Sequence, residues 1–440
     1  MSTGYKDVRL ARRANELFDR IVATGSVVLR RIGGDRGGEL AAHRFLSHPD
    51  ISPELLLETF ATRTSAACAG RFVVAVQDTT EINFAGRDAD RRDLGPAAGG
   101  KSTGFFVHPV IALDQSSGSV LGVVDAHIWT RPARTPNRRR LPYEEKESAR
   151  WLTMAESCAA RLSGARRIVV VGDRESDIHA LFARRPDGVE MVVRSRHDRQ
   201  VRGGLRLSEA VAAQAPLGRM EVAIAARPGR KARVAQVVVR AVRVEVLRPA
   251  ESVDVDDAPC VALTVVDVVE EAAPCGAKAL HWRLLTTLEV ADMAAAREVV
   301  AIYRLRWRIE EVFRVLKRQG LDLPGTQVRR GESLFNLAAL AIAAAARIVQ
   351  LVDARDSSER PATDVLDEEL LPLVARISQS LEGKTQRQKN PHPPGSLAWL
   401  AWVVARLGGW NCYYKPPGPK TMAEGWKQLA AMLAGAMLLA

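Results

Sequence analysis

The order of strands and helices between residues 72 and 194 constrains the fold more than any other feature of this chain. Short apolar runs rich in valine indicate buried strands, and two longer stretches indicate helices. A turn at 115–118 that ends in glycine suits a hairpin between the second and third strands. In chain order we expect strands at 72–76, 106–113 and 120–128, a helix at 143–162, a strand at 167–171, a helix at 176–184 and a strand at 190–194. This order predicts an α/β domain.

Two aspartates stand where strands of this domain end. Asp78 follows the first strand, and Asp173 follows the strand at 167–171. A single aspartate after a strand is usually a turn residue. Two of them in this order suit a carboxylate-bridged metal site, because ligands gather at the carboxyl ends of strands. The strand order itself matches a ribonuclease H-like α/β domain whose last catalytic helix lies further along the chain.

That helix is predicted at residues 302–319, which read IYRLRWRIEEVFRVLKRQ. At about 100° of rotation per residue, five polar residues fall within roughly 80° of one another: Tyr303, Arg306, Glu310, Arg314 and Lys317. The apolar residues on the neighbouring arc can bury the helix and leave this polar stripe accessible. One carboxylate among several bases suits a phosphodiester held beside a metal-bound acid. The alternative is an ordinary exposed basic face of a helix.

The remaining segments suggest how the chain divides into domains. With 440 residues, about two to four domains are expected. The predicted division is a helical N-terminal DNA-binding domain at 1–65, a catalytic domain at 66–200 and 290–352, a mostly β insertion at 201–289, and a helical C-terminal dimerisation domain at 353–440. The first segment could equally be a dimer or packing module. The tryptophan-bearing tail could be a satellite core or a partner surface.

Composition favours a nucleic-acid partner. Lys and Arg exceed Asp and Glu by 12, which points to a polyanion, with nucleic acid ahead of an acidic membrane. The five cysteines are scattered and look like small buried residues in a reducing compartment. The start of the chain lacks an apolar signal core. The apolar run at 337–346 is too short to cross a bilayer, and we expect it to form a buried helix. We expect a cytosolic or nucleoid-associated protein without a membrane partner.

Several motifs resemble those of a known enzyme family. The helix fits the signature YREK, with Tyr303, Arg306, Glu310 and Lys317 at matching spacing, and Asp78-Thr-Thr and Asp173-Arg-Glu-Ser-Asp fit the two aspartate motifs. Further matching segments are RWRIEE, MVVRSRH, PYEEKESARW, KSTGFFVHPV, HRFLSHPDIS, ARLGGW and EGWKQL. The chain thus resembles the DDE transposases of the insertion-sequence-four family, most closely the Tn-five type. It departs from the pattern in RESD, where a READ-like run is commoner, and in Arg314, where lysine is expected.

The resemblance implies roles for particular residues. Asp78, Asp173 and Glu310 would bind Mg²⁺, with Mn²⁺ tolerated in its place. Tyr303, Arg306 and Lys317 would hold the 5′-phosphate side of the cleaved DNA end, and Arg314 lies on the same stripe. Trp282 stands where the family stacks a flipped base, although a tryptophan half-buried in a sheet is the alternative. Arg194 and Arg196 match basic positions near the DNA, or are surface charges.

The function implied is cut-and-paste DNA transposition by two-metal phosphoryl transfer. The enzyme would bind double-stranded DNA at terminal inverted repeats, pair two ends in a homodimer, nick, form and open a hairpin, and join the end to target DNA. Two alternatives remain: a catalytically inactive DNA-binding regulator of transposition, and a stand-alone nuclease of the same fold.

Overall fold

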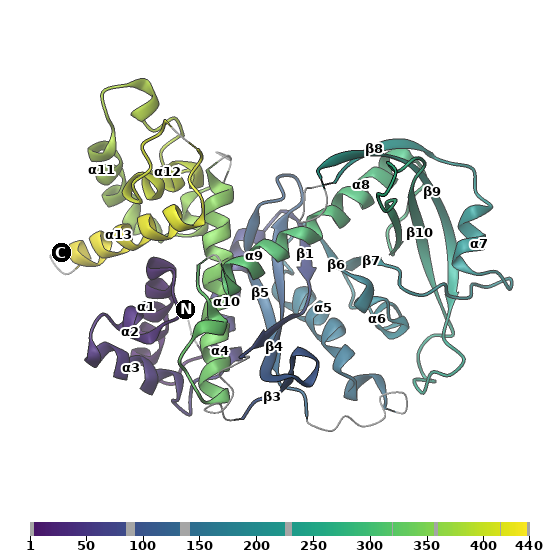
Figure 1. Cartoon of the computed structure of the whole chain (residues 1–440), viewed down its shortest axis with the longest axis horizontal. Coiled ribbons are helices and arrows are strands. Elements are labelled where there is room, and N and C mark those ends of the chain that lie inside the picture. Colours follow the sequence, from purple (N-terminus) through teal and green to yellow (C-terminus); the bar gives the residue numbers. More distant parts are fainter. Residues whose placement is uncertain are drawn as a thin grey trace.

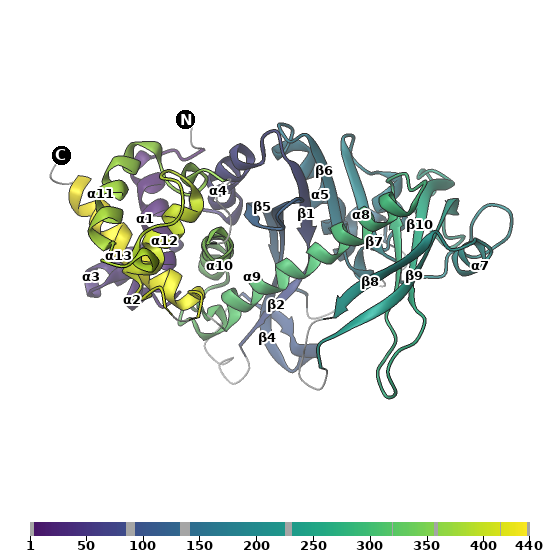
Figure 2. The same cartoon turned by 90° about the horizontal axis from the view of Figure 1, so that it is seen from above.

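One large mixed sheet with helices on both faces forms the centre of the protein (Figure 1, Figure 2). The structure is a computed structural model, and it describes residues 4–84, 93–132, 141–224, 231–318, 320–355, 360–413 and 415–437. Among these residues the sheet has eleven strands, in the order β2-β4-β1-β6-β7-β11-β10-β9-β8, with β3 and β5 also paired to β4. Gln319, the last residue of the predicted catalytic helix, lies outside the described residues.

The first half of the sheet has the ribonuclease H-like arrangement predicted from the sequence. Its five main strands are β1 (Phe72–Gln77), β4 (Ser102–Asp114), β5 (Val120–Trp129), β6 (Arg167–Gly172) and β7 (Val189–Arg194). They lie in the order β5-β4-β1-β6-β7. The first three are antiparallel, whereas β6 runs parallel to both β1 and β7. Two short strands, β2 (Thr80–Asn83) and β3 (Gly95–Ala97), complete this half.

The segment expected as a β-rich insertion continues the same sheet. It supplies β8 (Gly218–Ile224), β9 (Arg233–Leu247), β10 (Cys260–Glu270) and β11 (His281–Thr286). β11 pairs antiparallel with β7, so these strands are added directly to the edge of the first half. α7 (Leu207–Ala212) packs on β9 and β10 from one side, and α8 (Met293–Arg304) packs on β7 and β9.

Helices cover both faces of the central strands. α5 (Arg150–Arg161) and α6 (His179–Ala183) bury apolar residues in one of the two main hydrophobic clusters. The helix predicted at 143–162 begins late, because residues 143–145 and 147–149 form 3-10 turns instead. α4 (Pro53–Cys68), α9 (Arg308–Lys317) and α10 (Gly331–Ala354) lie in contact with one another or with β5.

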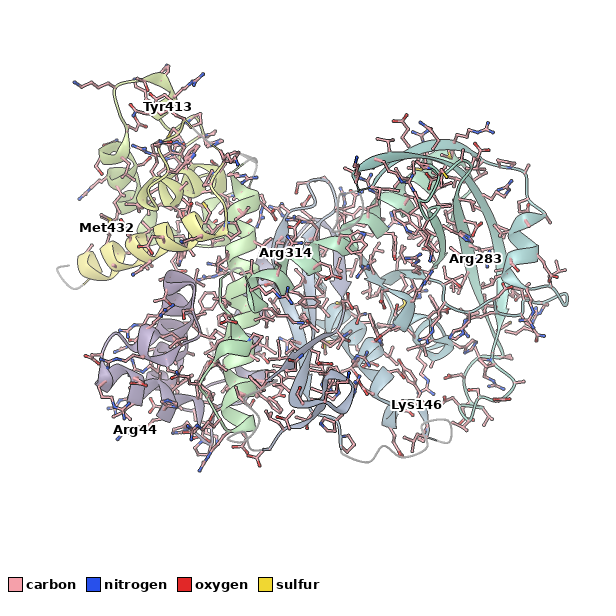
Figure 3. The ribbon with its side chains drawn as sticks, in the orientation of Figure 1. Arg44, Lys146, Arg283, Arg314, Tyr413 and Met432 are labelled. Carbon is pink, nitrogen blue, oxygen red and sulfur yellow. The ribbon has the colours of Figure 1, made fainter. Side chains whose placement is uncertain are left out.

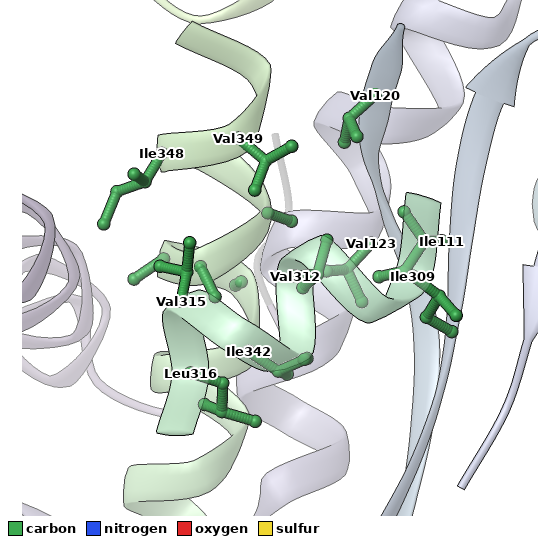
Figure 4. Packing of buried hydrophobic residues seen from close by; sticks show 14 of the residues in the cluster. Ile111, Val120, Val123, Ile309, Val312, Val315, Leu316, Ile342, Ile348 and Val349 are labelled. Carbon is green, nitrogen blue, oxygen red and sulfur yellow. The ribbon is translucent and has the colours of Figure 1, made fainter. Parts of the chain in front are cut away.

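The predicted catalytic helix is divided in two. α8 ends at Arg304, residues Leu305–Trp307 form a 3-10 turn, and α9 begins at Arg308. Figure 4 shows apolar side chains of α9 packed against α10 and against β4 and β5. Ile309, Val312 and Leu316 are fully buried there, which confirms the apolar arc predicted for this helix.

α10 is the central helix of the helical half. It has 24 residues and is long and apolar enough to cross a membrane, yet 89% of its most apolar window is buried inside the protein. Its alanine-rich middle lets α4, α9 and the terminal helices approach closely, because alanine adds little volume to the helix surface. This agrees with the expectation of a buried helix for residues 337–346.

The N-terminal and C-terminal helices share one hydrophobic core with α10. The N-terminal helices are α1 (Val8–Thr24), α2 (Leu29–Gly33) and α3 (Arg36–Leu46), and the C-terminal ones are α11 (Leu371–Leu381), α12 (Leu397–Leu407) and α13 (Pro419–Met437). α13 packs on α1, α10 and α12 (Figure 1). Trp399, Trp402 and Trp426 are all buried in this core. Of the two alternatives for the tail, an intramolecular core therefore accounts for these three tryptophans.

Candidate active site

The carboxyl ends of two adjacent parallel strands bring Asp78 and Asp173 together. β1 and β6 pair in register with Val76 opposite Val171, and each aspartate lies two residues beyond that pair. Neighbouring strands are about 4.8 Å apart, so the two acids leave the sheet side by side. Asp173 also caps a 3-10 turn, in which its Oδ1 accepts a hydrogen bond from the Glu175 amide at 2.7 Å.

Glu310 approaches from α9, and the guanidinium of Arg306 lies between it and Asp78. Arg306 Nη1 donates to Asp78 Oδ2 at 2.8 Å and lies 3.8 Å from Glu310 Oε1. Arg306 can reach both because the 3-10 turn that carries it packs against β1. Its side chain is 8% exposed, whereas that of Glu310 is 42% exposed. The buried guanidinium of Arg306 thus links Asp78, beside β1, to Glu310 on α9.

The electrostatic environment of Asp78 favours a further positive charge. Burial, together with the nearby charge of Asp173, raises the pKa of the Asp78 carboxyl to about 7. Arg306 and a hydrogen bond from the Thr79 amide act in the opposite direction, and Glu310 adds to the rise. Two carboxylates besides Asp78 thus lie near one arginine, and a divalent cation bound here would favour their charged forms.

The three acids fit a magnesium site in their chemistry. Carboxylate oxygens are the ligands that Mg²⁺ prefers. Within the described ranges, no three His, Cys, Asp or Glu side chains are close enough to hold one metal ion as they stand. Arg306 supplies the physical reason, because its guanidinium occupies the space between Asp78 and Glu310.

This arrangement predicts that Arg306 stabilises the metal-free protein. In Arg306→Gln, buried Asp78 loses its charged donor, so we expect the free energy of unfolding to fall by about 1–3 kcal/mol. The loss should be greater at pH 8 than at pH 6, because the pKa of Asp78 is about 7 and the carboxyl must carry its charge above that value. Urea denaturation in EDTA measures it. Arg314→Gln, on the exposed part of α9, is the control, and equal stabilities of the two variants would contradict the prediction.

The remaining residues of the polar stripe lie at different depths. Tyr303 is buried, Lys317 is half-buried, and Arg314 is exposed on α9 (Figure 3). Burial lowers the pKa of the Lys317 ammonium, while Glu81 and Glu310 oppose this shift. The prediction that the whole stripe is accessible is therefore wrong for Tyr303 and Arg306. A uniform 100° rotation does not hold through the 3-10 turn, and β1 covers this end of the helix.

Trp282, Tyr303 and Arg194 form a second cluster beside the acids. The rings of Trp282 and Tyr303 meet edge to face with centroids 5.4 Å apart, and Trp282 is only 9% exposed. Arg194 donates to the carbonyl of His281 at 3.0 Å. Burial raises the pKa of the Tyr303 phenol, and the nearby charge of Arg194 opposes that rise. Tyr303 contacts the Trp282 ring in this DNA-free structure, so base stacking by Trp282 stays a prediction.

Arg196 lies on an exposed loop after β7 that a buried carboxylate holds in place. Asp177 Oδ2 accepts hydrogen bonds from the amides of Arg196 and His197 at 2.7 and 2.9 Å, and its Oδ1 accepts one from Arg199 Nε at 2.9 Å. Asp177 belongs to the RESD run of the second aspartate motif. The sequence pattern assigned it no role, whereas the structure shows that it positions the loop carrying Arg196.

Sequence reasoning also missed residues that contact the two acid-bearing loops. Arg150 and His108 are both buried, and both form hydrogen bonds with the Thr79 hydroxyl. Arg150 lies in the segment PYEEKESARW, which resembles the family. The resemblance therefore pointed to this segment but assigned no role to Arg150. Trp307, next to Arg306, is 40% exposed, and the Arg306 guanidinium lies 4.6 Å from its ring centroid.

A family model described as "Transposase DDE domain" matches residues 71–346, well over half of the chain. The matched segment begins at β1 and ends within α10. It therefore contains the strand-end aspartates, the strands added to the sheet, and the helix that carries Glu310.

Proposed function

Because the chain belongs to the transposase DDE domain family, we propose that it is a cut-and-paste DNA transposase of the Tn-five type within the insertion-sequence-four family. The observation that carries the proposal is that Asp78 and Asp173 follow paired strand ends, while Arg306 links Asp78 to Glu310. The family itself supports a DNA-cleaving polynucleotidyl transferase. The YREK residues on the predicted catalytic helix favour the assignment to the Tn-five type.

In this proposal Asp78, Asp173 and Glu310 hold divalent cations, with Mg²⁺ used and Mn²⁺ tolerated. Bound there, the metal would polarise the scissile phosphate and lower the pKa of an attacking water or 3′-hydroxyl. Arg306 exchanges the Asp78 carboxylate for a phosphate oxygen when DNA enters, because a guanidinium binds either anion through paired hydrogen bonds.

Five further side chains hold the DNA end in this proposal. Tyr303 and Lys317 bind the 5′-phosphate side of the cleaved end, and the exposed Arg314 extends that contact along α9. Arg194 and Arg196 bind the backbone on the β7 side. The half-buried position of Lys317 supports its role, because a partly dehydrated ammonium interacts more strongly with phosphate than one in bulk water.

The proposed partners are double-stranded DNA with terminal inverted repeats, target DNA, and a second copy of the chain in the paired-end complex. The reaction sequence is nicking, hairpin formation, hairpin opening and strand transfer, in the cytoplasm at the nucleoid. A catalytically inactive regulator is disfavoured because the acids and YREK residues are all present. A stand-alone nuclease is disfavoured because simple hydrolysis needs neither the insertion at 201–289 nor an end-pairing C-terminal region.

Incubation with a supercoiled plasmid that carries the flanking repeats tests the proposal. Mg²⁺-dependent nicking separates an enzyme from an inactive regulator, and strand-transfer products separate a transposase from a nuclease. Nicking without any strand transfer would reject transposition in favour of the nuclease. Specific repeat binding without nicking would favour the regulator.

Trp282 provides a test of the hairpin step. Stacking on an extruded base is worth roughly 1–3 kcal/mol, and each 1.4 kcal/mol corresponds to about a tenfold change in rate. Trp282→Leu keeps an apolar side chain against Tyr303 and removes the aromatic face. We expect it to slow hairpin formation by about tenfold or more and to leave first-strand nicking unchanged. Trp282→Phe should recover part of the rate.

The assay is a time course with a pre-nicked end, with the hairpin resolved on a denaturing gel. Because Trp282 packs on Tyr303, a purely structural role would slow nicking and hairpin formation equally in the leucine variant. That result would contradict the stacking role. Unfolding temperatures of both variants serve as the control for folding.

A further inference from the structure

Arg150 is a buried arginine whose guanidinium joins three separate segments. Nε donates to Thr79 Oγ1 at 3.1 Å, Nη1 to the Glu147 carbonyl at 2.7 Å, and Nη2 to Glu175 Oε2 at 3.1 Å. The side chain is 7% exposed. A buried charge is costly unless it is paired and hydrogen-bonded, so these partners together determine where the guanidinium lies.

Two of those partners adjoin the proposed metal ligands. Thr79 follows Asp78 directly, and its amide donates to Asp78 Oδ1 at 2.8 Å. Glu175 lies two residues after Asp173, and its amide donates to Asp173 Oδ1 at 2.7 Å. One planar guanidinium therefore spans the loop after β1 and the loop after β6, beyond the last backbone pair that joins those strands.

Thr79 is in turn fixed by a series of buried hydrogen bonds through His108 and Gln77. Gln77 Nε2 donates to the Trp151 carbonyl at 3.2 Å, which leaves Gln77 Oε1 to accept from His108 Nε2 at 2.9 Å. His108 Nδ1 must then accept the Thr79 hydroxyl at 2.8 Å. The Thr79 hydroxyl oxygen can then accept the hydrogen bond from Arg150. Every donor in this series of hydrogen bonds therefore meets an acceptor.

The aromatic surroundings hold Arg150 but do not account for its polar contacts. Its guanidinium carbon lies 5.3 Å from the Trp129 ring centroid and 5.5 Å from that of Trp151. Cation–π contacts of this kind would hold a lysine ammonium as well. A fork that reaches Thr79 and Glu175 at the same time requires a guanidinium, because lysine presents a single nitrogen.

We infer that Arg150 is a positioning residue that sets the separation of Asp78 and Asp173 and thereby their affinity for a divalent cation. The inference rests on the proposed function only in taking these aspartates as metal ligands. Outer residues that orient metal ligands typically change metal affinity by about 10–100-fold when they are replaced. We expect a loss in this range for Arg150→Met and also for Arg150→Lys.

Arg184 offers a matched control. It is a partly buried arginine that pairs with Glu144, Asp254 and Asp257 and lies 5.6 Å from the Tyr143 ring centroid. Like Arg150, it has carboxylate and aromatic partners, but none of its ion pairs among the described residues reaches the loop of Asp78 or that of Asp173. Arg184→Lys should leave the metal affinity as in the wild type.

The experiment titrates the DNA-free protein with Mn²⁺ and follows free Mn²⁺ by electron paramagnetic resonance. Asp78→Asn identifies the binding that belongs to the site. Arg150→Lys and Arg150→Met should bind Mn²⁺ about 10–100-fold more weakly. The Mg²⁺ concentration for half-maximal nicking should rise by the same factor, while the rate at saturating Mg²⁺ approaches that of the wild type. Unfolding temperatures measured in EDTA show whether each variant folds. If Arg150→Met does not fold, the Mn²⁺ affinity of Arg150→Lys decides the test.

An Arg150→Lys variant with wild-type Mn²⁺ affinity, or an equal loss in Arg184→Lys, overturns the inference. If the wild type binds Mn²⁺ through Asp78 but does not nick DNA, the proposed function fails and the inference stands. If the wild type nicks and Arg150→Lys keeps its metal response, the inference alone fails. Should Mn²⁺ bind the DNA-free protein too weakly for titration, the Mg²⁺ dependence of nicking decides between the same outcomes.

Discussion

Asp78→Asn, Asp173→Asn and Glu310→Gln are each expected to reduce nicking of the terminal repeat by at least about a thousandfold. Metal-ion catalysis supplies several kcal/mol of charge stabilisation, and each 1.4 kcal/mol corresponds to about a tenfold change in rate. The amide variants keep the size of the side chain and remove the negative charge that a cation needs. Nicking of a supercoiled plasmid with Mg²⁺, resolved on an agarose gel, measures the loss.

DNA binding should survive in the same variants. Affinity for the duplex comes mostly from contacts of Lys and Arg with phosphates, and these three substitutions remove no positive charge. A gel shift with one labelled end should therefore give a dissociation constant close to that of the wild type. Binding that weakened in parallel with nicking would instead indicate that the acids support the fold of the DNA-binding surface.

Glu311→Gln is the matched control on the same helix. Glu311 adjoins Glu310 but pairs with Arg308, which also pairs with Asp353 of α10. Its carboxylate therefore serves the packing of α9 on α10, and its replacement should leave nicking unchanged. If any one of the three acid variants nicked as fast as this control, that acid would not be a metal ligand.

The positions of the strand-end acids could be predicted because they depend on short-range patterns. A valine-rich run followed by aspartate places Asp78 and Asp173 at strand ends, and the order of elements makes those strands neighbours. The parallel pairing of β1 with β6 agrees with the ribonuclease H-like order expected from the sequence. The burial of Ile309, Val312 and Leu316 was predictable for a similar reason, since it depends on helical periodicity alone.

Contacts between distant segments could not be predicted from those patterns. Arg306 and Asp78 are 228 residues apart, and Arg150 and Thr79 are 71 residues apart. A helical projection identifies which residues share a face, but it does not say that a 3-10 turn will interrupt the helix or which residue will then meet β1. Periodicity likewise shows that residues 201–289 contain strands, but not that β11 pairs with β7.

Deletion of Ser396–Ala440 is expected to prevent stable folding and so to abolish both the single-end and the paired-end DNA complexes. A separate C-terminal dimerisation domain, as predicted from the sequence, would give a milder result, with single-end binding spared. The structure alters that expectation because α12 and α13 belong to the core that contains α1 and α10. Circular dichroism during heating, together with solubility on expression, measures the loss.

The size of this effect follows from the buried face of α13. Met422, Trp426, Leu429 and Leu433 are buried, and each large apolar side chain contributes about 1.5–3 kcal/mol on burial. Their sum of about 6–12 kcal/mol is comparable to the whole net stability of a typical domain, about 5–15 kcal/mol. The chain entropy of an ordered helix offsets part of it. The remaining loss is still several kcal/mol, because apolar faces of α1 and α10 also become exposed.

Disappearance of the paired-end complex after this deletion would therefore not identify a dimer contact. A substitution on the outer face of α13 tests the proposed contact without disturbing the core. Met432 is 49% exposed there (Figure 3), so Met432→Glu should leave the unfolding temperature and single-end binding unchanged. If this face joins the two copies, a buried carboxylate would weaken the paired-end complex about tenfold or more, since an unpaired buried charge is costly.

The deletion itself has an outcome that would contradict this account of the tail. If the truncated protein unfolded like the wild type and bound one end normally, the tryptophans of the tail could not be essential to the core.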